Sequence, residues 1–136
     1  MKTVVVAIPS YHREKVLMAK TIPLLLKRGF NPLQITIFVA DEAQGTAYRS
    51  QLPEDVTCVV AAPGICAVRN FIHRHYPPGT WVLSVDDDVA DILEKVDAKR
   101  TQTILSLHAF VEIAFQIAEK ENCKIWILRG HGCCHC

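Results

Sequence analysis

Four short apolar runs, separated by segments of helical periodicity, constrain the fold of this chain more than any other feature. The runs cover residues 3–8, 33–40, 56–61 and 81–85 and are rich in Val and Ile. Continuous runs of this kind are typical of strands that are buried on both faces of a sheet. Strands that alternate with helices form parallel sheets with right-handed crossovers. We therefore predict an α/β fold of the Rossmann type, a mostly parallel sheet flanked by helices with a strand order near 3-2-1-4.

The segments between and after these runs carry apolar residues at helical spacing. A helix is expected over 13–28, with a kink or a new turn at Pro23 because proline lacks a backbone N–H, and Gly29 is placed to end it. Three further helices are predicted over 43–51, 65–75 and 103–122, and a fifth strand over 124–128. In the last helix the residues expected to face the core are Ile104, Leu107, Val111, Ala114, Phe115 and Ala118.

Composition narrows the class of protein further. A chain of 136 residues with 50% hydrophobic residues is enough for one packed domain, and a net charge of +1 gives no strong overall attraction to nucleic acid or membrane. The apolar segment at the amino terminus ends at Pro9 and is too short for a signal peptide. No apolar segment approaches the roughly 20 residues that a membrane span needs. We therefore expect a cytoplasmic protein with no membrane partner.

Polar residues follow each of the four predicted strands, and the carboxyl ends of parallel strands share one edge of the sheet, where ligands bind. That edge is the predicted binding site. Its candidate residues, in chain order, are Pro9, Ser10, Tyr11, Arg13, Asp41, Gly64, Arg69, Asn70, Asp86, Asp87 and Asp88.

The aspartate triplet is the most informative of these candidates. Three adjacent carboxylates repel one another unless a cation neutralises them, and their hard oxygens suit Mg²⁺ or Mn²⁺. In extended backbone, Asp86 and Asp88 point to one side and Asp87 to the other. This assigns Asp86 and Asp88 to a metal and Asp87 to a sugar or ribose hydroxyl. The alternative is a solvated acidic loop that caps the following turn.

Each of the other candidates has a ligand role and a purely structural alternative. Arg69 is placed to bridge a diphosphate or to pair with an aspartate, and otherwise is a surface arginine. Tyr11 suits stacking on a nucleobase, or is an aromatic at the edge of the core, and Arg13 is similarly balanced. Asp41 either accepts a hydrogen bond from a base or caps a helix, and Gly64 either lets the backbone approach a ligand or serves a turn.

In this order, these residues resemble the GT-A glycosyltransferases. The segment from Ile8 to Arg13 looks like their first-strand signature, Ala67-Val68-Arg69-Asn70 resembles their "ARN" segment, and Val85-Asp86-Asp87-Asp88 is similar to their DxD motif. A closer resemblance is to the TET/JBP-associated glycosyltransferases of bacteriophages and eukaryotes. The resemblance implies a nucleotide-sugar donor, with UDP as the expected nucleotide, and Mn²⁺ or Mg²⁺ on the aspartates. It also implies a hydroxymethylated DNA base as acceptor.

The carboxy-terminal part departs from the GT-A pattern. We interpret residues 1–128 as the nucleotide-sugar-binding half of such an enzyme, truncated before an acceptor half, and no residue is a candidate for the catalytic base. Residues 129–136 form a Cys/His-rich tail that we interpret as non-native or disordered. Adjacent Cys133 and Cys134 do not easily share one tetrahedral zinc ion, so a zinc site there is the weaker interpretation.

Three alternative functions stay open from the sequence. The first alternative is a non-catalytic nucleotide-sugar-binding fragment. The second is a nucleotidyltransferase that uses the same aspartates, and the third is a metal-binding module built on the tail. A P-loop phosphoryl transferase is excluded because the chain has no G-x-x-x-x-G-K-[ST] segment. The sequence fixes neither the sugar nor the oligomeric state.

Overall fold

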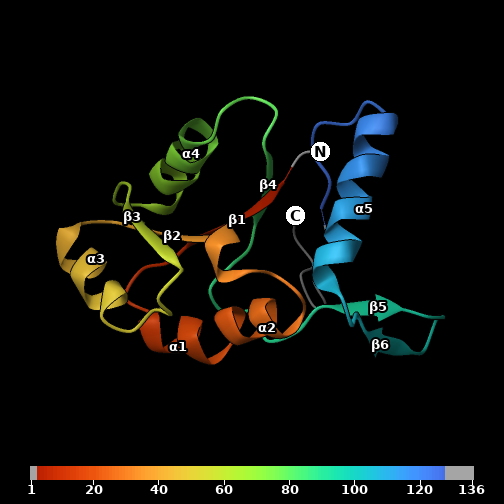
Figure 1. Cartoon of the computed structure of the whole chain (residues 1–136), viewed down its shortest axis with the longest axis horizontal. Helices are drawn as coiled ribbons and strands as arrows, with labels where there is room; N and C mark the ends of the chain where they lie inside the picture. The colour runs from red at the N-terminus through yellow and green to blue at the C-terminus, as the bar shows by residue number, and fades with distance from the viewer. Residues whose placement is uncertain (1–2, 128–136) are drawn as a thin grey trace.

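The structure is a computed structural model, and it describes residues 3–127, apart from the side chain of Lys95. It is built from a parallel sheet, helices on both of its faces, and a small hairpin followed by a long helix (Figure 1). In chain order the elements are β1 (Val4–Pro9), α1 (Glu14–Ala19), α2 (Thr21–Lys27), η1 (Pro32–Gln34), β2 (Ile35–Val39), α3 (Glu42–Arg49), β3 (Thr57–Val60), α4 (Ile65–His75), β4 (Trp81–Ser84), β5 (Leu93–Lys95), β6 (Thr101–Thr103) and α5 (Leu107–Lys120).

The main sheet has four strands in the order β3-β2-β1-β4, and every neighbouring pair is parallel. The register places Val6 of β1 between Ile35 of β2 and Leu83 of β4. This confirms the predicted α/β class, the Rossmann-like arrangement and the 3-2-1-4 order. The polar residues that follow β1, β2, β3 and β4 therefore lie along one edge of the sheet.

Side chains on the two faces of the sheet belong to two separate clusters of buried residues. One face packs against α1, α2, α3 and α5 through residues such as Leu17, Leu25 and Val111. The other face is smaller, where Ala7 and Phe38 pack against α4. Figure 1 shows the same division, with α4 on one side of the strands and α1 and α2 on the other. Burial on both faces explains why the strands are continuous apolar runs.

The first helical segment is two helices, and the break between them lies at Lys20 rather than at Pro23. Helix α1 ends at Ala19, and α2 begins at Thr21, so Pro23 falls in the first turn of α2. A proline ring clashes with the carbonyl of the residue four positions earlier, which here is Ala19, and the first turn needs no N–H from it. The proline therefore ends the preceding helix upstream of itself.

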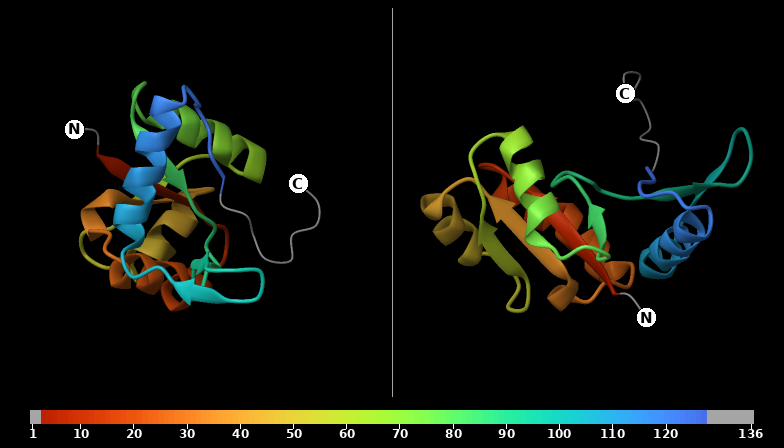
Figure 2. Two further views of the ribbon diagram at one scale, coloured as in Figure 1. Left: turned by 90° about the vertical axis from the view of Figure 1, so that its right-hand side faces the viewer. Right: turned by 90° about the horizontal axis from the view of Figure 1, so that it is seen from above.

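The carboxy-terminal region differs most from the prediction. Residues 103–106 are not helical, because Thr103 pairs with Leu93 in an antiparallel hairpin, and α5 begins at Leu107 after its N-cap Ser106. No hairpin was predicted, because its strands have only three residues each. In Figure 2 the hairpin extends away from the main sheet, beside α5. The core-facing residues predicted for α5 are buried or half-buried.

The predicted fifth strand over 124–128 is wrong for the part that the structure describes, since residues 124–127 form no strand. Trp126 instead packs on Phe115 of α5, with ring centroids 5.1 Å apart, and Phe115 stacks on Trp81 of β4. The segment is held by aromatic packing, and Ile125 and Ile127 are exposed. Leu128 and the Cys/His tail lie outside the described residues. No helix in the described part of the chain is long and apolar enough to span a membrane.

Candidate functional site

A pocket of about 570 Å³ opens at the carboxyl edge of the sheet. It is formed by residues that follow all four parallel strands, as expected for a ligand site in this fold. Eight of the eleven predicted site residues line it, namely Pro9, Ser10, Tyr11, Arg13, Gly64, Asp86, Asp87 and Asp88. Ala40, Pro63, Ile65 and Val68 complete the wall. The pocket thus combines an apolar side with a carboxylate-rich side.

A closed ring of polar contacts supports the carboxylate side. The Ser10 hydroxyl donates to Asp87 Oδ2 at 2.7 Å, and the Tyr48 hydroxyl lies 2.6 Å from Ser10 Oγ. Because the single Ser10 proton is directed to Asp87, Tyr48 must donate to Ser10. The backbone N–H of Arg13 donates to the Tyr48 oxygen at 3.0 Å, and Arg13 Nη1 lies 3.3 Å from Asp87 Oδ1. The Tyr48 hydroxyl therefore donates to Ser10, and the Ser10 hydroxyl donates to Asp87.

Burial keeps the Tyr48 phenol of this ring protonated. Tyr48 is fully buried, and this desolvation raises the pKa of its phenol above the ordinary value, against the opposing effect of the hydrogen bond with Ser10. The phenol therefore stays protonated at neutral pH and serves as a donor. Ser10 and Asp87 are also buried, at 8% and 6% exposed. The buried Tyr48, Ser10 and Asp87 side chains are all paired with one another, which holds these three in one geometry.

The three aspartates do not share one environment. Strand β4 ends at Ser84, but burial still alternates through the following turn, so Asp86 and Asp88 are exposed and Asp87 is buried. Asp86 Oδ1 lies 3.5 Å from Arg69 Nη2, and Asp88 Oδ2 lies 3.5 Å from Arg13 Nη2. The exposed carboxylates at the pocket are therefore the two that the sequence assigns to a metal.

Hard carboxylate oxygens suit Mn²⁺ or Mg²⁺, and Asp86 and Asp88 present them at the pocket wall. Within residues 3–127, no group of three or more His, Cys, Asp and Glu side chains is arranged to hold a metal ion. A divalent cation here would take one or two carboxylates and complete its shell with phosphate oxygens and water. Asp86 and Asp88 are the residues that would hold such a cation.

The side chain of Thr21 holds the aspartate turn, residues 86–89, through two hydrogen bonds to its backbone. Its buried hydroxyl donates to the Asp86 carbonyl at 2.7 Å and accepts the Val89 N–H at 3.0 Å. One side chain at the start of α2 thereby satisfies a backbone acceptor and a backbone donor at opposite ends of the turn. The turn that carries the three carboxylates is held to α2 by these two bonds.

We expect Thr21→Val to destabilise the fold by about 2 kcal/mol, because it keeps the shape but leaves the Asp86 carbonyl and the Val89 N–H without partners. Urea unfolding measures the loss. Thr80→Val is the matched control, since the Thr80 hydroxyl donates to the Pro77 carbonyl on an exposed turn, and it should change stability by less than about 0.5 kcal/mol. Equal effects of the two substitutions would contradict the role given to Thr21.

Gly64 stands where β3 is joined to α4, with φ at +94°. Only glycine adopts this region without strain, and a Cβ at this position would meet no atom within 4 Å. The glycine is therefore required by the turn, and it leaves open space beside the pocket. Both interpretations made from the sequence are compatible with this geometry.

Three predicted residues do not line the pocket. The Asp41 side chain accepts the Gln44 N–H at 2.9 Å and so caps α3. Arg69 and Asn70 are exposed on α4, where Arg69 is connected to the pocket through Asp86. The ligand roles of these three residues stay predictions.

Sequence reasoning missed the residues that hold the pocket in shape. Tyr48, Thr21 and Gln44 lie within helices and contact the pocket loops through buried or part-buried hydrogen bonds. Gln44 Oε1 accepts the N–H of His12, which has a positive φ of 53° in the loop after β1. A polar residue next to an apolar helical run, as at Thr21, was a sequence signal for one of these contacts, whereas Gln44 and Tyr48 lie in a mostly polar helix that gives no such signal.

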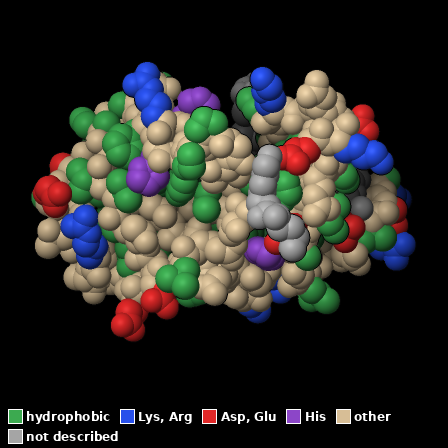
Figure 3. Space-filling view, turned by 45° about the horizontal axis from the view of Figure 1, so that its top comes forward, with side chains coloured by type: hydrophobic (Ala, Val, Ile, Leu, Met, Phe, Trp, Pro, Cys, Tyr) green, Lys and Arg blue, Asp and Glu red, His purple; other side chains and the backbone are tan. Residues whose placement is uncertain are grey.

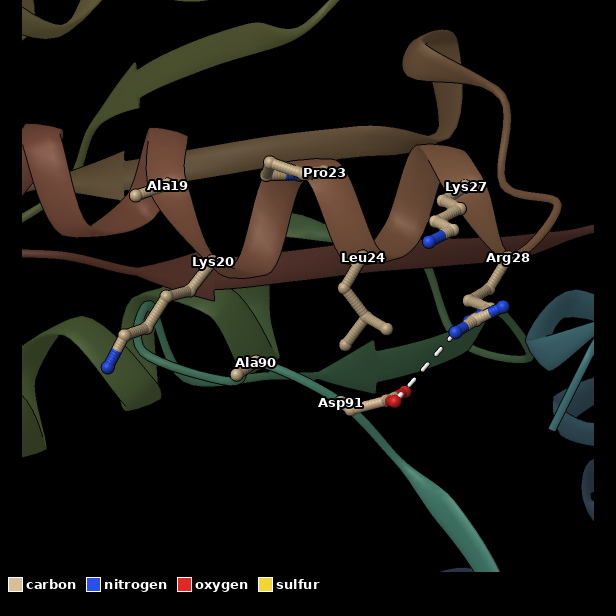
Figure 4. A pocket seen from close by; sticks show the side chains of 8 residues that line it. All are labelled: Ala19, Lys20, Pro23, Leu24, Lys27, Arg28, Ala90 and Asp91. Carbon is tan, nitrogen blue, oxygen red and sulfur yellow. Dashed lines mark ion pairs between the residues drawn. The ribbon is translucent and has the colours of Figure 1, made fainter. Parts of the chain in front are cut away.

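A second pocket, of about 240 Å³, lies between α1, α2 and the segment after the aspartate turn. Figure 4 shows Arg28 pointing toward Asp91 across it, with an ion-pair distance of 3.8 Å, while Lys20 points away from that pair. This pocket is smaller and lacks the polar strand ends. The larger pocket is therefore the candidate ligand site.

Comparisons with known proteins identify no relative, since no family model, no curated protein and no solved structure matches this chain. A function is therefore inferred from the fold and from the residues that line the pocket.

Proposed function

We propose that the pocket binds the nucleoside diphosphate part of a nucleotide-sugar, with UDP as the expected nucleotide, together with Mn²⁺ or Mg²⁺. In this proposal the chain is the donor-binding part of a GT-A-type glycosyltransferase. The observation that carries it is a pocket of about 570 Å³ lined by residues that follow all four strands, among them both apolar side chains and the three aspartates. The apolar wall suits a base and ribose, and the carboxylate side suits a metal–diphosphate group.

The charge of the site supports a metal-dependent ligand. Three aspartates and the two arginines paired with them leave one net negative charge at the pocket. A diphosphate alone would be repelled by this charge. A bound divalent cation reverses its sign and acts as a Lewis acid on the leaving diphosphate, and Arg69 adds positive charge nearby.

Tyr11 is the proposed partner of the nucleobase. Its side chain is 59% exposed and lines the pocket, which disfavours a role as a core-edge aromatic. Stacking on an aromatic ring contributes about 1–3 kcal/mol per base. We expect Tyr11→Ala to weaken UDP binding about tenfold or more. Tyr11→Phe keeps the ring and should bind UDP as the wild type does. Equal loss in both variants would rule out stacking.

The location of the ligand is tested by amide chemical shifts in a titration with UDP-glucose and Mg²⁺. We expect the largest shifts at Ser10, Arg13, Gly64 and the aspartate turn. Shifts confined to Lys20, Lys27 and Ala90 would place the ligand in the second pocket and overturn the proposal.

Binding and transfer need separate assays, because the sequence offers no catalytic base. Donor hydrolysis and sugar transfer, each measured with Mn²⁺, distinguish an enzyme from a non-catalytic nucleotide-sugar-binding protein. Release of pyrophosphate from a nucleoside triphosphate would instead indicate a nucleotidyltransferase. Hydroxymethylated DNA belongs among the acceptors because of the sequence resemblance. On the face drawn in Figure 3, Lys and Arg side chains lie apart and are interspersed with Asp and Glu.

A cytoplasmic site of action is part of the proposal. The cysteines that the structure describes, Cys58, Cys66 and Cys123, are free thiols. Free thiols suit a reducing compartment.

A further inference from the structure

The positive charge of Arg13 lies beside two carboxylates of the aspartate turn, where a bound cation would also place its charge. Its guanidinium bridges two carboxylates, with Nη1 3.3 Å from Asp87 Oδ1 and Nη2 3.5 Å from Asp88 Oδ2. One arginine thus neutralises part of the charge of the aspartate turn. A divalent cation on Asp88 would meet this guanidinium as a like charge.

The backbone of Arg13 is fixed, although its side chain is not enclosed. The N–H donates to Tyr48, and the carbonyl accepts from the N–H of Leu17 at 2.9 Å. The side chain is 47% exposed, and it makes two rather long ion pairs. The pair with Asp88 is exposed on both sides and is therefore weak, so breaking it costs little. Asp87 is buried, and it keeps the hydrogen bond from Ser10 when the guanidinium moves away. The fixed backbone keeps a released side chain at the pocket wall.

Arg69 repeats the arrangement on the other exposed aspartate. Its side chain is 53% exposed, and its Nη2 lies 3.5 Å from Asp86 Oδ1. Each aspartate of the turn therefore has an arginine partner, and both arginines extend from elements beside the pocket. Arg13 lines the pocket, and Arg69 is connected to it through Asp86, so both guanidinium groups are available to an anionic ligand there.

From this geometry we propose that Arg13 is the resident counterion of the aspartate turn, and that cation binding releases it to bind the phosphates of the ligand. This inference rests on the proposed function. Arg13 opposes binding of the metal alone and favours binding of the nucleotide, which couples the two. Without nucleotide, the metal binds weakly because Arg13 repels it. Without metal, the nucleotide binds weakly because Arg13 stays paired with Asp87 and Asp88.

The test is Arg13→Gln, with two measurements on the whole chain. The first is the affinity for Mn²⁺ alone, from the electron paramagnetic resonance signal of free Mn²⁺, which should tighten about fivefold. The second is calorimetric UDP affinity at saturating Mn²⁺, which should weaken about tenfold. A positioning residue that merely shapes the site would weaken both.

Arg49→Gln is the matched control. Arg49 is 48% exposed and pairs with Glu42 at 3.7 Å on α3, and it does not line the pocket. Both affinities should match the wild type in this variant. Arg13→Lys is a second test variant that keeps the charge, and its Mn²⁺ affinity should stay near that of the wild type.

Unchanged or weaker Mn²⁺ binding by Arg13→Gln, in a chain that binds UDP with Mn²⁺, would overturn the counterion role and leave the proposed function standing. A wild-type chain that binds Mn²⁺ but no UDP would overturn the proposed function, and the Mn²⁺ comparison would still decide the counterion role. A wild-type chain that binds neither would overturn both.

Discussion

Replacing Asp86 and Asp88 together with asparagine is expected to weaken Mn²⁺-dependent UDP binding by about 100-fold, or about 2.7 kcal/mol. The two side chains are the exposed carboxylates of the aspartate turn, and they are the hard oxygen ligands available to a cation there. Because neither side chain is buried, stability should change little, so that a loss of binding reports on the site rather than on the fold. Calorimetry with Mn²⁺ and UDP measures the binding.

The matched control removes two charges elsewhere. Glu54→Gln with Asp55→Asn alters two adjacent exposed carboxylates in the turn before β3, outside the pocket. This variant should bind UDP as the wild type does. If it lost as much affinity as the Asp86 and Asp88 variant, net charge rather than metal ligation would explain the effect.

Tyr48→Phe is expected to destabilise the fold by about 2 kcal/mol while keeping its packing. The phenol oxygen is the central member of the ring, and without it both Ser10 Oγ and the Arg13 N–H lose a buried partner. Urea unfolding measures the change. Tyr11→Phe removes an exposed hydroxyl and should leave stability within about 0.5 kcal/mol of the wild type.

The Tyr48 contribution also has a defined pH dependence. Burial raises the pKa of this phenol in the folded chain above the ordinary value of 10.0. The stabilisation is therefore fully present below about pH 10 and is lost as pH rises through the folded-state pKa. The stability difference between the wild type and Tyr48→Phe should shrink in that range. A difference that persists unchanged at higher pH would contradict the assigned protonation state.

The parallel sheet could be predicted because its signal is local and strong. A strand buried on both faces needs a continuous apolar run. Because the strands are parallel, their carboxyl ends all lie at the same edge of the sheet. The same reasoning placed Ser10, Arg13 and the aspartates at one pocket. The predicted alternation of exposed, buried and exposed side chains at Asp86, Asp87 and Asp88 is present, but its assumed cause is wrong, because β4 ends at Ser84 and Asp87 and Asp88 lie in a turn rather than in extended backbone.

The unpredicted features depend on contacts between residues that are distant in the chain. Tyr48 and Ser10 are 38 positions apart, and Thr21 and Asp86 are 65 apart, so no local pattern announces their hydrogen bonds. The pairing of Arg13 with two aspartates is of the same kind. Residues 124–127 carry a strand-like apolar pattern, but Trp126 packs on Phe115 instead of joining the sheet. Tertiary packing overrides local propensity there.

The most direct measurement is a calorimetric titration of UDP into the wild-type chain, carried out once with Mn²⁺ and once after removal of divalent cations with a chelator. We expect one UDP bound per chain with Mn²⁺ and a loss of measurable binding after chelation, because the site is net negative without a cation. Binding of equal strength in both conditions, or none in either, would contradict a metal-dependent nucleotide site at the aspartate turn.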